Sequence, residues 1–207
     1  MYLPASFRED RPEELHALIR AHPLGTLVTQ GAGELQASPL PFLLDNTTLR
    51  AHMARANPHW KTLDGHDGLV IFMGPDAYVT PDWYPSKAAT HKVVPTWNYA
   101  AVHVRGTIRV VDEPGWLAQQ IADLTAAHEA CRPRPWAPSD APADFIAAQM
   151  KAVVGLEIAI TAIEGKWKMS QNREPADREG VIRGMGDPDD PHHDLVVAGV
   201  VERCSRG

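Results

Sequence analysis

The segment from Leu49 to Leu63 combines residues that suit the binding of a phosphate group. Alternation in its first half predicts a short strand, and Asn57, a preferred N-cap residue followed by proline, predicts that a short helix begins there. Free backbone N–H groups at such a helix start favour an anion. Arg55, His59 and Lys61 would surround it with positive or protonatable groups. A solvated helix start with scattered basic residues is the simpler interpretation of the same pattern.

Aromatic side chains form a second candidate set. Most of them lie beside expected turns or strand ends rather than inside apolar runs; they are Trp60, Trp83, Tyr84, Trp97, Tyr99 and Trp167. Such rings either pack as ordinary half-buried side chains or offer flat surfaces and N–H donors to a planar ligand. Combined with a phosphate site, the second interpretation predicts a phosphorylated flat cofactor, for which FMN is the simplest candidate.

Other kinds of chemistry have no support in the sequence. The ten histidines have no partners at a recognisable metal-ligand spacing, so no metal site is predicted. We find no Gly-x-Ser-x-Gly elbow, no Gly-rich phosphate loop and no Rossmann fingerprint, which leaves hydrolase and kinase chemistry without positive evidence.

Composition narrows the class of protein further. The net charge is −6 and Lys and Arg form no block, so direct DNA contact is disfavoured, because DNA binding depends on neutralising phosphates. No apolar run approaches the roughly 20 residues of a membrane span. The N-terminus lacks the pattern of a secretory signal, and two cysteines do not make a disulfide framework. We therefore expect a cytoplasmic protein with no membrane contact.

Periodicity and turn residues predict a mainly β protein with helices, of the α+β class. A strand over 35–44 contains Pro39 and Pro41, which cannot donate to a β ladder, so this strand must be bulged or at an edge. We expect a break at 74–76 and a polar loop over 86–92. The other expected strands are 24–29, 49–54, 68–73, 77–80, 95–110 and 154–163, and the expected helices are 12–22, 113–130, 145–153, 177–185 and 193–203. An antiparallel barrel with helices at its ends fits this order, with 1–185 as the domain and 186–207 as a linker and short helical tail.

Several stretches of the chain resemble one known family. They are Met1–Phe7, Ala51–Trp60, Phe72–Tyr84, Val94–Val104, Ile163–Arg173 and Asp177–Val181. In this order they resemble the PaiB-type FMN-binding negative transcriptional regulators, part of the pyridoxamine-phosphate-oxidase-like split-barrel superfamily. The resemblance implies an antiparallel, Greek-key-like split β-barrel that forms a homodimer and binds FMN at the subunit interface.

The resemblance also implies which residues contact the cofactor. For the phosphate they are Ser38, Pro39, Leu40, His52, Met53, Ala54, Asn57, His59 and Lys61; for the flavin ring or a substrate they are Trp97, Asn98, Gln171 and Arg173. Two positions depart from the oxidases of the superfamily. His59 stands where those enzymes carry a phosphate-binding lysine, and Ala101 stands where they place a glutamine against the flavin.

Three functions remain in view at this point. The leading hypothesis is an FMN-binding negative transcriptional regulator that acts without strong direct DNA contact, through a partner if DNA is involved. The alternative is a flavin-dependent oxidoreductase of the pyridoxamine-phosphate-oxidase-like type acting on a small molecule, although no catalytic residue is identified. A split barrel that has lost FMN is the third possibility. The fold alone does not choose among them.

Overall fold

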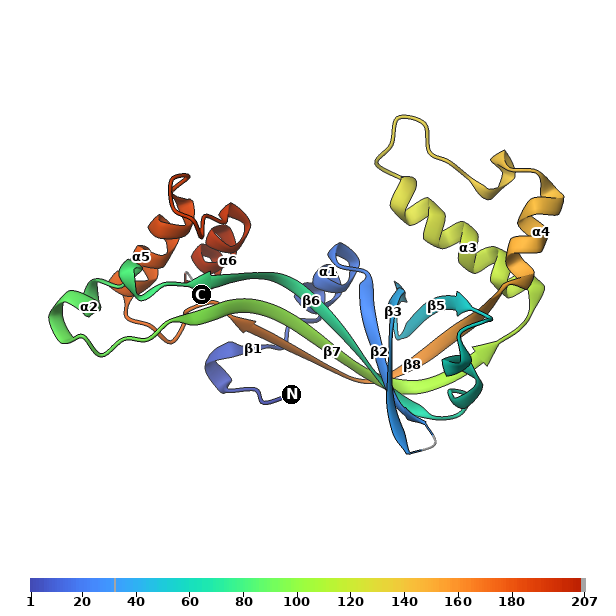
Figure 1. Cartoon of the computed structure of the whole chain (residues 1–207), viewed down its shortest axis with the longest axis horizontal. Coiled ribbons are helices and arrows are strands. Elements are labelled where there is room, and N and C mark those ends of the chain that lie inside the picture. Colours follow the sequence, from blue (N-terminus) through green and yellow to red (C-terminus); the bar gives the residue numbers. More distant parts are fainter. Residues whose placement is uncertain (32, 206–207) are drawn as a thin grey trace. The chain divides into compact units, whose positions relative to one another are not determined.

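The computed structural model describes residues 1–31 and 33–205 (Figure 1). The strands are β1 Arg8–Glu9, β2 Leu24–Gly31, β3 Glu34–Pro41, β4 Leu43–Asp45, β5 Thr48–Ala54, β6 Asp67–Val79, β7 Thr96–Val111 and β8 Val153–Lys168. The helices are α1 Pro12–Ala21, α2 Pro85–Thr90, α3 Pro114–Glu129, α4 Ala143–Lys151, α5 Pro175–Gly186 and α6 Leu195–Ser205. Short 3₁₀ turns complete the fold at Ala5–Phe7, Pro58–Thr62, Pro81–Trp83 and Pro138–Asp140.

The chain divides into two compact units. The first unit comprises residues 1–18, 73–102 and those from 164 onward; the second comprises 19–72 and 103–163. Strands β6, β7 and β8 contribute residues to both units. The strand order is β3-β2-β6-β7-β8-β5-β4, with β1 paired to β8, and the registers of the pairs β1–β8, β2–β3, β2–β6, β4–β5 and β5–β8 are all antiparallel.

In the second unit, β2 and β3 form a hairpin whose register pairs Thr26 with Pro39 and Leu24 with Pro41. Strand β3 ends the strand order, so its outer side has no ladder to interrupt, and the predicted edge strand is confirmed. Strand β5 pairs with β8, as in Ala51 with Leu156. Alternate residues of these strands fill the core. Completely buried core side chains of this unit include Leu27, Leu49, Leu63, Val70, Leu156 and Ile158.

Helices α3 and α4 pack together in the second unit, as Figure 1 shows. Helix α3 begins with Pro114 at a position where a missing N–H costs nothing. A guanidinium nitrogen of Arg50 on β5 donates to Asp123 of α3 at 2.9 Å, which joins this helix to the sheet. Helix α3 also approaches β8 closely, since a Cβ on Gly155 would lie 2.2 Å from the ring of Trp116.

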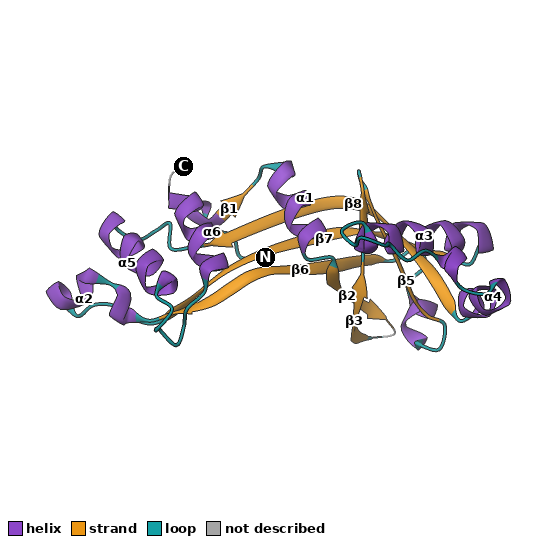
Figure 2. Ribbon diagram, turned by 90° about the horizontal axis from the view of Figure 1, so that it is seen from above, coloured by secondary structure: helices purple, strands orange, loops and turns teal. Residues whose placement is uncertain are grey.

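Helices α2, α5 and α6 belong to the first unit, and α5 contacts both of the others (Figure 2). The buried carboxylate of Asp177 on α5 accepts hydrogen bonds from the backbone N–H and the hydroxyl of Ser86 on α2, at 3.0 and 2.7 Å. Helix α6 follows a turn in which the N–H of Asp194 donates to the carbonyl of Met185 at 2.9 Å. Residues on both sides of position 185 therefore lie in one compact unit.

Three sequence expectations are wrong in detail. Strand β6 is continuous across the expected break at 74–76, because Gly74 serves close packing: a Cβ there would lie 2.8 Å from the side chain of Leu18 and 3.2 Å from Ala100. Residues 86–92 are mostly helix α2 rather than loop, since Pro85 starts the helix and α5 anchors it. Strand β8 extends past residue 163, because β1 pairs with its end.

The expected helices at 12–22, 113–130, 145–153, 177–185 and 193–203 are confirmed as α1, α3, α4, α5 and α6, with every end within two residues of its expected position. Within the described part of the chain, no helix is both long and apolar enough to cross a bilayer.

Candidate functional site

The turn after β5 is built as the sequence predicts. Asn57 caps the 3₁₀ turn Pro58–Thr62, and its Oδ1 accepts a hydrogen bond from the backbone N–H of His59 at 3.1 Å. The backbone N–H of Asn57 donates in turn to the carbonyl of Ala54 at 2.9 Å. The predicted N-cap and proline are confirmed, although the helix is a single 3₁₀ turn. Hydrogen bonds to the residues before and after Asn57 thus fix the conformation of the turn.

His59 lies at the centre of a buried hydrogen-bond cluster, with 4% of its surface exposed. Its Nε2 lies 2.7 Å from the hydroxyl of Thr29 on β2, and its Nδ1 lies 2.8 Å from the hydroxyl of Ser38 on β3. The side-chain amide of Asn57 donates to the same Ser38 oxygen at 3.3 Å. We call these four residues the His59 cluster. It ties the turn to the β2–β3 hairpin.

Burial lowers the pKa of His59 below its usual range, so the ring is neutral at physiological pH. A neutral imidazole donates from one nitrogen and accepts at the other. Both nitrogens of His59 are engaged by hydroxyls, so the ring has no free donor for a ligand. Its place in the cluster is to hold Ser38 and the turn.

The basic side chains near the turn differ in what they can bind. Lys61 is exposed, and its ammonium has no ion pair or hydrogen bond within the described part of the chain. Arg55 instead donates to Asp112 at 2.8 and 2.5 Å and to the carbonyls of Lys151 and Val153. The guanidinium lowers the pKa of the Asp112 carboxyl. Lys61 is therefore the cation that remains available beside the His59 cluster, whereas Arg55 is held elsewhere.

The other residues predicted for the phosphate have varied surroundings. Leu40 and Met53 are core side chains, 7% and 3% exposed, whereas Pro39 and Ala54 are exposed. His52 is half-buried, burial lowers its pKa, and its Nδ1 is buried with no hydrogen-bond partner among the described residues. Of these five, Ala54 touches the His59 cluster through its carbonyl, which accepts from the N–H of Asn57. No described hydrogen bond joins the other four to the cluster, and the role of all five toward a cofactor stays a prediction.

In the first unit, Asn98 and Ser170 lie buried side by side, with 1% and 4% of their surfaces exposed. The Asn98 amide and the Ser170 hydroxyl are 3.1 Å apart. The neighbouring Gln171 clamps the turn after β8: its Oε1 accepts from the N–H of Met169 at 2.7 Å, and its Nε2 donates to the carbonyl of Trp167 at 2.6 Å. Gln171 thus uses its oxygen and one amide proton on the backbone.

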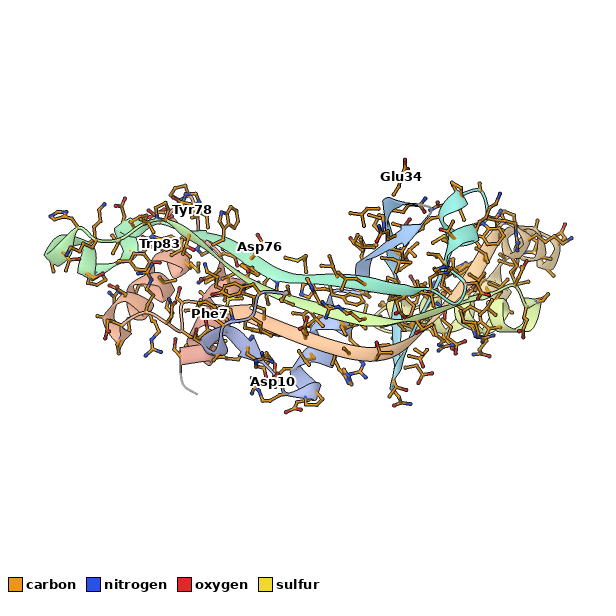
Figure 3. All side chains as sticks on the ribbon, turned by 90° about the horizontal axis from the view of Figure 1, so that it is seen from below. Phe7, Asp10, Glu34, Asp76, Tyr78 and Trp83 are labelled. Atoms are coloured by element: carbon orange, nitrogen blue, oxygen red, sulfur yellow. The ribbon has the colours of Figure 1, made fainter. Side chains whose placement is uncertain are left out.

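Trp97 and Arg173, also predicted for the flavin, are more accessible. Trp97 is 53% exposed, and its ring packs edge-on against Tyr78, 6.0 Å between centroids. Figure 3 shows Tyr78 on β6. The Arg173 guanidinium stacks 4.7 Å from the ring centroid of Tyr84. These two side chains present flat faces from the first unit.

Sequence reasoning missed Thr29 as a member of the cluster. It lies 30 residues before His59, and nothing in its local pattern distinguishes it from other strand threonines. Ser170, whose hydroxyl joins Asn98, lies in the Ile163–Arg173 stretch and was not among the residues predicted to contact the cofactor. Such a pair can be recognised when a hydroxyl of a strand faces the core beside a histidine of a turn. That placement is known only once the register of the strand is known.

The residues beside the turn fit a phosphate group. Asn57 has a second amide proton that no described contact uses, Ser38 is a hydroxyl oriented by two neighbours, and Lys61 carries an unpaired charge. Such donors suit phosphate oxygens, and a lysine can act on them as a point charge. All three of these phosphate-binding candidates belong to the second unit.

Comparison with known proteins agrees with this chemistry. A family model described as "Putative FMN-binding domain" matches residues 1–162. The chain belongs to this family. A Bacillus subtilis member, protease synthase and sporulation protein PAI 2, is 30% identical, over 93% of this chain and 92% of its own length. An uncharacterized protein of Emericella nidulans is 38% identical, over 89% and 90%.

A solved structure shares the fold of this chain. The flavocytochrome Anf3 of Azotobacter vinelandii superposes with a TM-score of 0.58 at 15% identity, covering 78% of this chain and 69% of that one. At this identity the likeness concerns the fold. The α+β class with an antiparallel sheet and the split-barrel fold of the pyridoxamine-phosphate-oxidase-like proteins are therefore confirmed.

Proposed function

We propose that this protein is a homodimeric FMN-binding regulator, which represses transcription through a partner rather than by strong DNA contact of its own. The observation that carries the FMN assignment is the anchored turn beside a free cation. The His59 cluster holds the turn Pro58–Thr62, and Lys61, within this turn, is exposed and has no partner among the described residues. Preorganised donors bind an anion more strongly than mobile ones, because less conformational entropy is lost on binding.

In this proposal the FMN phosphate is bound by Lys61, the free amide proton of Asn57 and the hydroxyl of Ser38. His59 positions Ser38 and does not touch the phosphate, since both of its ring nitrogens are already engaged. The related oxidases differ, because they carry a phosphate-binding lysine at the position of His59. The neutral ring at position 59 leaves the charge of the site to Lys61.

The flavin ring is assigned to Trp97, Asn98 and Arg173 of a second copy of the chain, which completes the site. Large apolar side chains left exposed support burial against another chain, among them Leu24 at 66% and Leu35 at 78%. FMN, when bound, supplies a carrier of one or two electrons. The chain's own part is to bind and orient it.

The name of one relative supports a regulatory role, and the negative net charge of the chain argues against direct DNA contact in that role. The Bacillus subtilis relative is named for protease synthesis and sporulation, which suits the control of a process. The net charge of −6 disfavours strong attraction to DNA phosphates, so a DNA-binding partner is the favoured route to any promoter.

The decisive experiment compares FMN with riboflavin, which lacks the phosphate. Titration of wild-type protein is expected to quench FMN fluorescence to saturation with one FMN per chain. Lys61→Ala is expected to weaken FMN binding about tenfold, because a charge-assisted contact is lost, and to leave riboflavin binding unchanged. Lys151→Ala, an exposed lysine in the same unit, is the matched control with no expected effect on either flavin.

Five results would each count against a part of the proposal. Failure of wild-type protein to bind FMN at micromolar concentrations removes the cofactor assignment. Equal losses for FMN and riboflavin in Lys61→Ala would mean that Lys61 does not contact the phosphate. A monomer at all concentrations in light scattering, or salt-sensitive binding of promoter DNA in a gel shift, would contradict the dimer and the partner respectively. Steady turnover of NAD(P)H with bound FMN would favour an oxidoreductase.

A further inference from the structure

A small cavity in the first unit has an unusual lining. Its volume is about 160 Å³, and Phe7 of the N-terminal 3₁₀ turn, labelled in Figure 3, contributes its one aromatic wall. The remaining side chains of the wall are all polar or positively charged: Thr96, Asn98, Lys168, Ser170, Asn172 and Arg173. No carboxylate is among the described residues that line it. We call it the Lys168 cavity.

Two cations line the cavity without an ion-pair partner among the residues that the structure describes. The half-buried ammonium of Lys168 donates to the hydroxyl of Thr96 at 2.5 Å and to the carbonyl of Trp97. The guanidinium of Arg173 stacks on Tyr84. Within the described part of the chain, neither cation lies within salt-bridge distance of an acid. Both are oriented, but their charge is not neutralised.

Burial and like charges make this arrangement costly. Burial lowers the pKa of Lys168, and the nearby charges of Lys166 and Arg173 lower it further. Lys166 is itself 9% exposed; it donates to the carbonyl of Tyr2 at 3.1 Å. Desolvated like charges destabilise a fold unless an opposite charge accompanies them. An anion in the cavity would remove that cost.

The turn beside the cavity is held in shape before any ligand arrives. Ser170 has a φ of 65°, in the left-handed region, and Gln171 clamps this turn through its two backbone hydrogen bonds. The N–H of Arg173 donates to the carbonyl of Ser170 at 2.9 Å. A non-glycine residue in this conformation is uncommon, and such strain recurs at ligand sites. The donors of the wall are thereby held in fixed positions.

The volume restricts what the cavity can hold. Pockets for drug-sized ligands are about 300–1,000 Å³, so a volume of about 160 Å³ is too small for a whole flavin. A carboxylate or phosphate group fits, because it is compact and accepts several hydrogen bonds at once.

We propose that the Lys168 cavity binds a compact oxyanion, the carboxylate or phosphate group of a small acid, through Lys168 and Arg173. Asn172 and the Asn98–Ser170 pair complete the polar wall. This site adds to the proposed function: it shares Asn98 and Arg173 with the residues assigned to the flavin ring, but none with the turn proposed to hold the FMN phosphate, and it is tested without FMN.

The experiment titrates the full-length protein with sodium acetate and with inorganic phosphate by calorimetry, at constant ionic strength. At least one of the two anions is expected to bind saturably at one site per chain. Lys168→Gln and Arg173→Gln are each expected to weaken that binding about tenfold, and Lys168→Arg, which keeps the charge, to retain most of it. Lys92→Gln, an exposed lysine of the same unit, is the matched control and is expected to bind as wild type does.

The two probes separate the possible sources of the anion. Preference for acetate identifies a carboxylic acid, and preference for phosphate identifies a phosphorylated compound. No saturable binding of either anion overturns the proposal, as does binding that both glutamine variants leave unchanged. Should Lys168→Gln fail to fold in circular dichroism, Arg173→Gln carries the test. If FMN displaces the anion and riboflavin does not, the cavity takes the cofactor's own phosphate, and a separate acid site is refuted.

Discussion

The His59 cluster and the Lys168 cavity are both polar and largely buried, yet they use their hydrogen-bonding groups in opposite ways. In the cluster, the two ring nitrogens of His59 are engaged by Thr29 and Ser38, and the ring is neutral. In the cavity, Lys168 and Arg173 are oriented by neutral groups and lack any described counter-charge. The cluster is therefore neutral with its hydrogen bonds satisfied, whereas the cavity carries positive charge that no described residue neutralises.

This difference separates stability from binding. A satisfied neutral network in a low-dielectric interior strengthens the fold and specifies one arrangement of it. Uncompensated buried charge weakens the fold and is retained where a ligand supplies the missing charge. We therefore expect substitutions in the cluster to act mainly on unfolding, and substitutions in the cavity to act mainly on anion affinity.

The largest effect is expected for His59→Ala. The change leaves the buried Thr29 hydroxyl without its partner, removes one of the two partners of Ser38, and opens a small void. We expect a loss of about 3 kcal/mol in the free energy of unfolding, measured by urea denaturation. His128→Ala, an exposed histidine on α3, is the matched control, with a loss below about 0.5 kcal/mol.

His59→Gln sharpens the same measurement. Glutamine keeps one donor and one acceptor near the hydroxyls, so its loss should be clearly smaller than that of alanine. A wild-type free energy of unfolding in His59→Ala would show that the cluster does not stabilise the fold, and the contrast with the cavity would fail.

A smaller loss is expected for Asn98→Ala at the cavity wall. The change removes the described partner of the buried Ser170 hydroxyl. We expect the free energy of unfolding, measured by urea denaturation, to fall by about 1.5 kcal/mol. Asn172→Ala, exposed on the same turn, should cost less than about 0.5 kcal/mol. An equal loss for the two variants would mean that the Asn98–Ser170 pair contributes nothing beyond its surface neighbours.

The parts of the fold that could be predicted from the sequence depend on local signals. Helix α1 follows from its apolar spacing and the proline that ends it, the cap from Asn57, and the edge strand β3 from two prolines. Each of these signals acts within a few residues of itself, so no knowledge of the tertiary structure was needed.

The parts that could not be predicted depend on distant neighbours. Gly74 suggests a turn in sequence, yet it lies within a strand because Leu18 and Ala100 pack against it. His59 suggests a phosphate ligand, yet its ring is buried, and it has no nitrogen left for a phosphate because Thr29 and Ser38 engage both of them. In both cases the chemistry of the residue is evident from the sequence, whereas its partners come from distant segments of the chain that tertiary packing brings to it.

The last prediction concerns pH and tests whether His59 is neutral. Burial lowers the pKa of His59 and of His52 in the folded state, below the ordinary value of about 6.5. As pH falls through that value, the unfolded chain takes up protons that the folded chain does not, so the free energy of unfolding falls. The loss is complete once the folded rings are protonated too. At pH above about 7.5 both states are neutral and stability is at its plateau.

We expect urea unfolding of wild-type protein to show this shallow decline between about pH 7 and pH 5. His59→Gln should reduce the slope, and adding His52→Gln should reduce it further, because each change removes one titrating ring. The acidic group Asp112, whose pKa is lowered by Arg55, contributes only at lower pH and does not obscure the result. A slope unchanged by His59→Gln would mean that the ring titrates alike in both states, and the cluster would then lose its defining contrast with the cationic cavity.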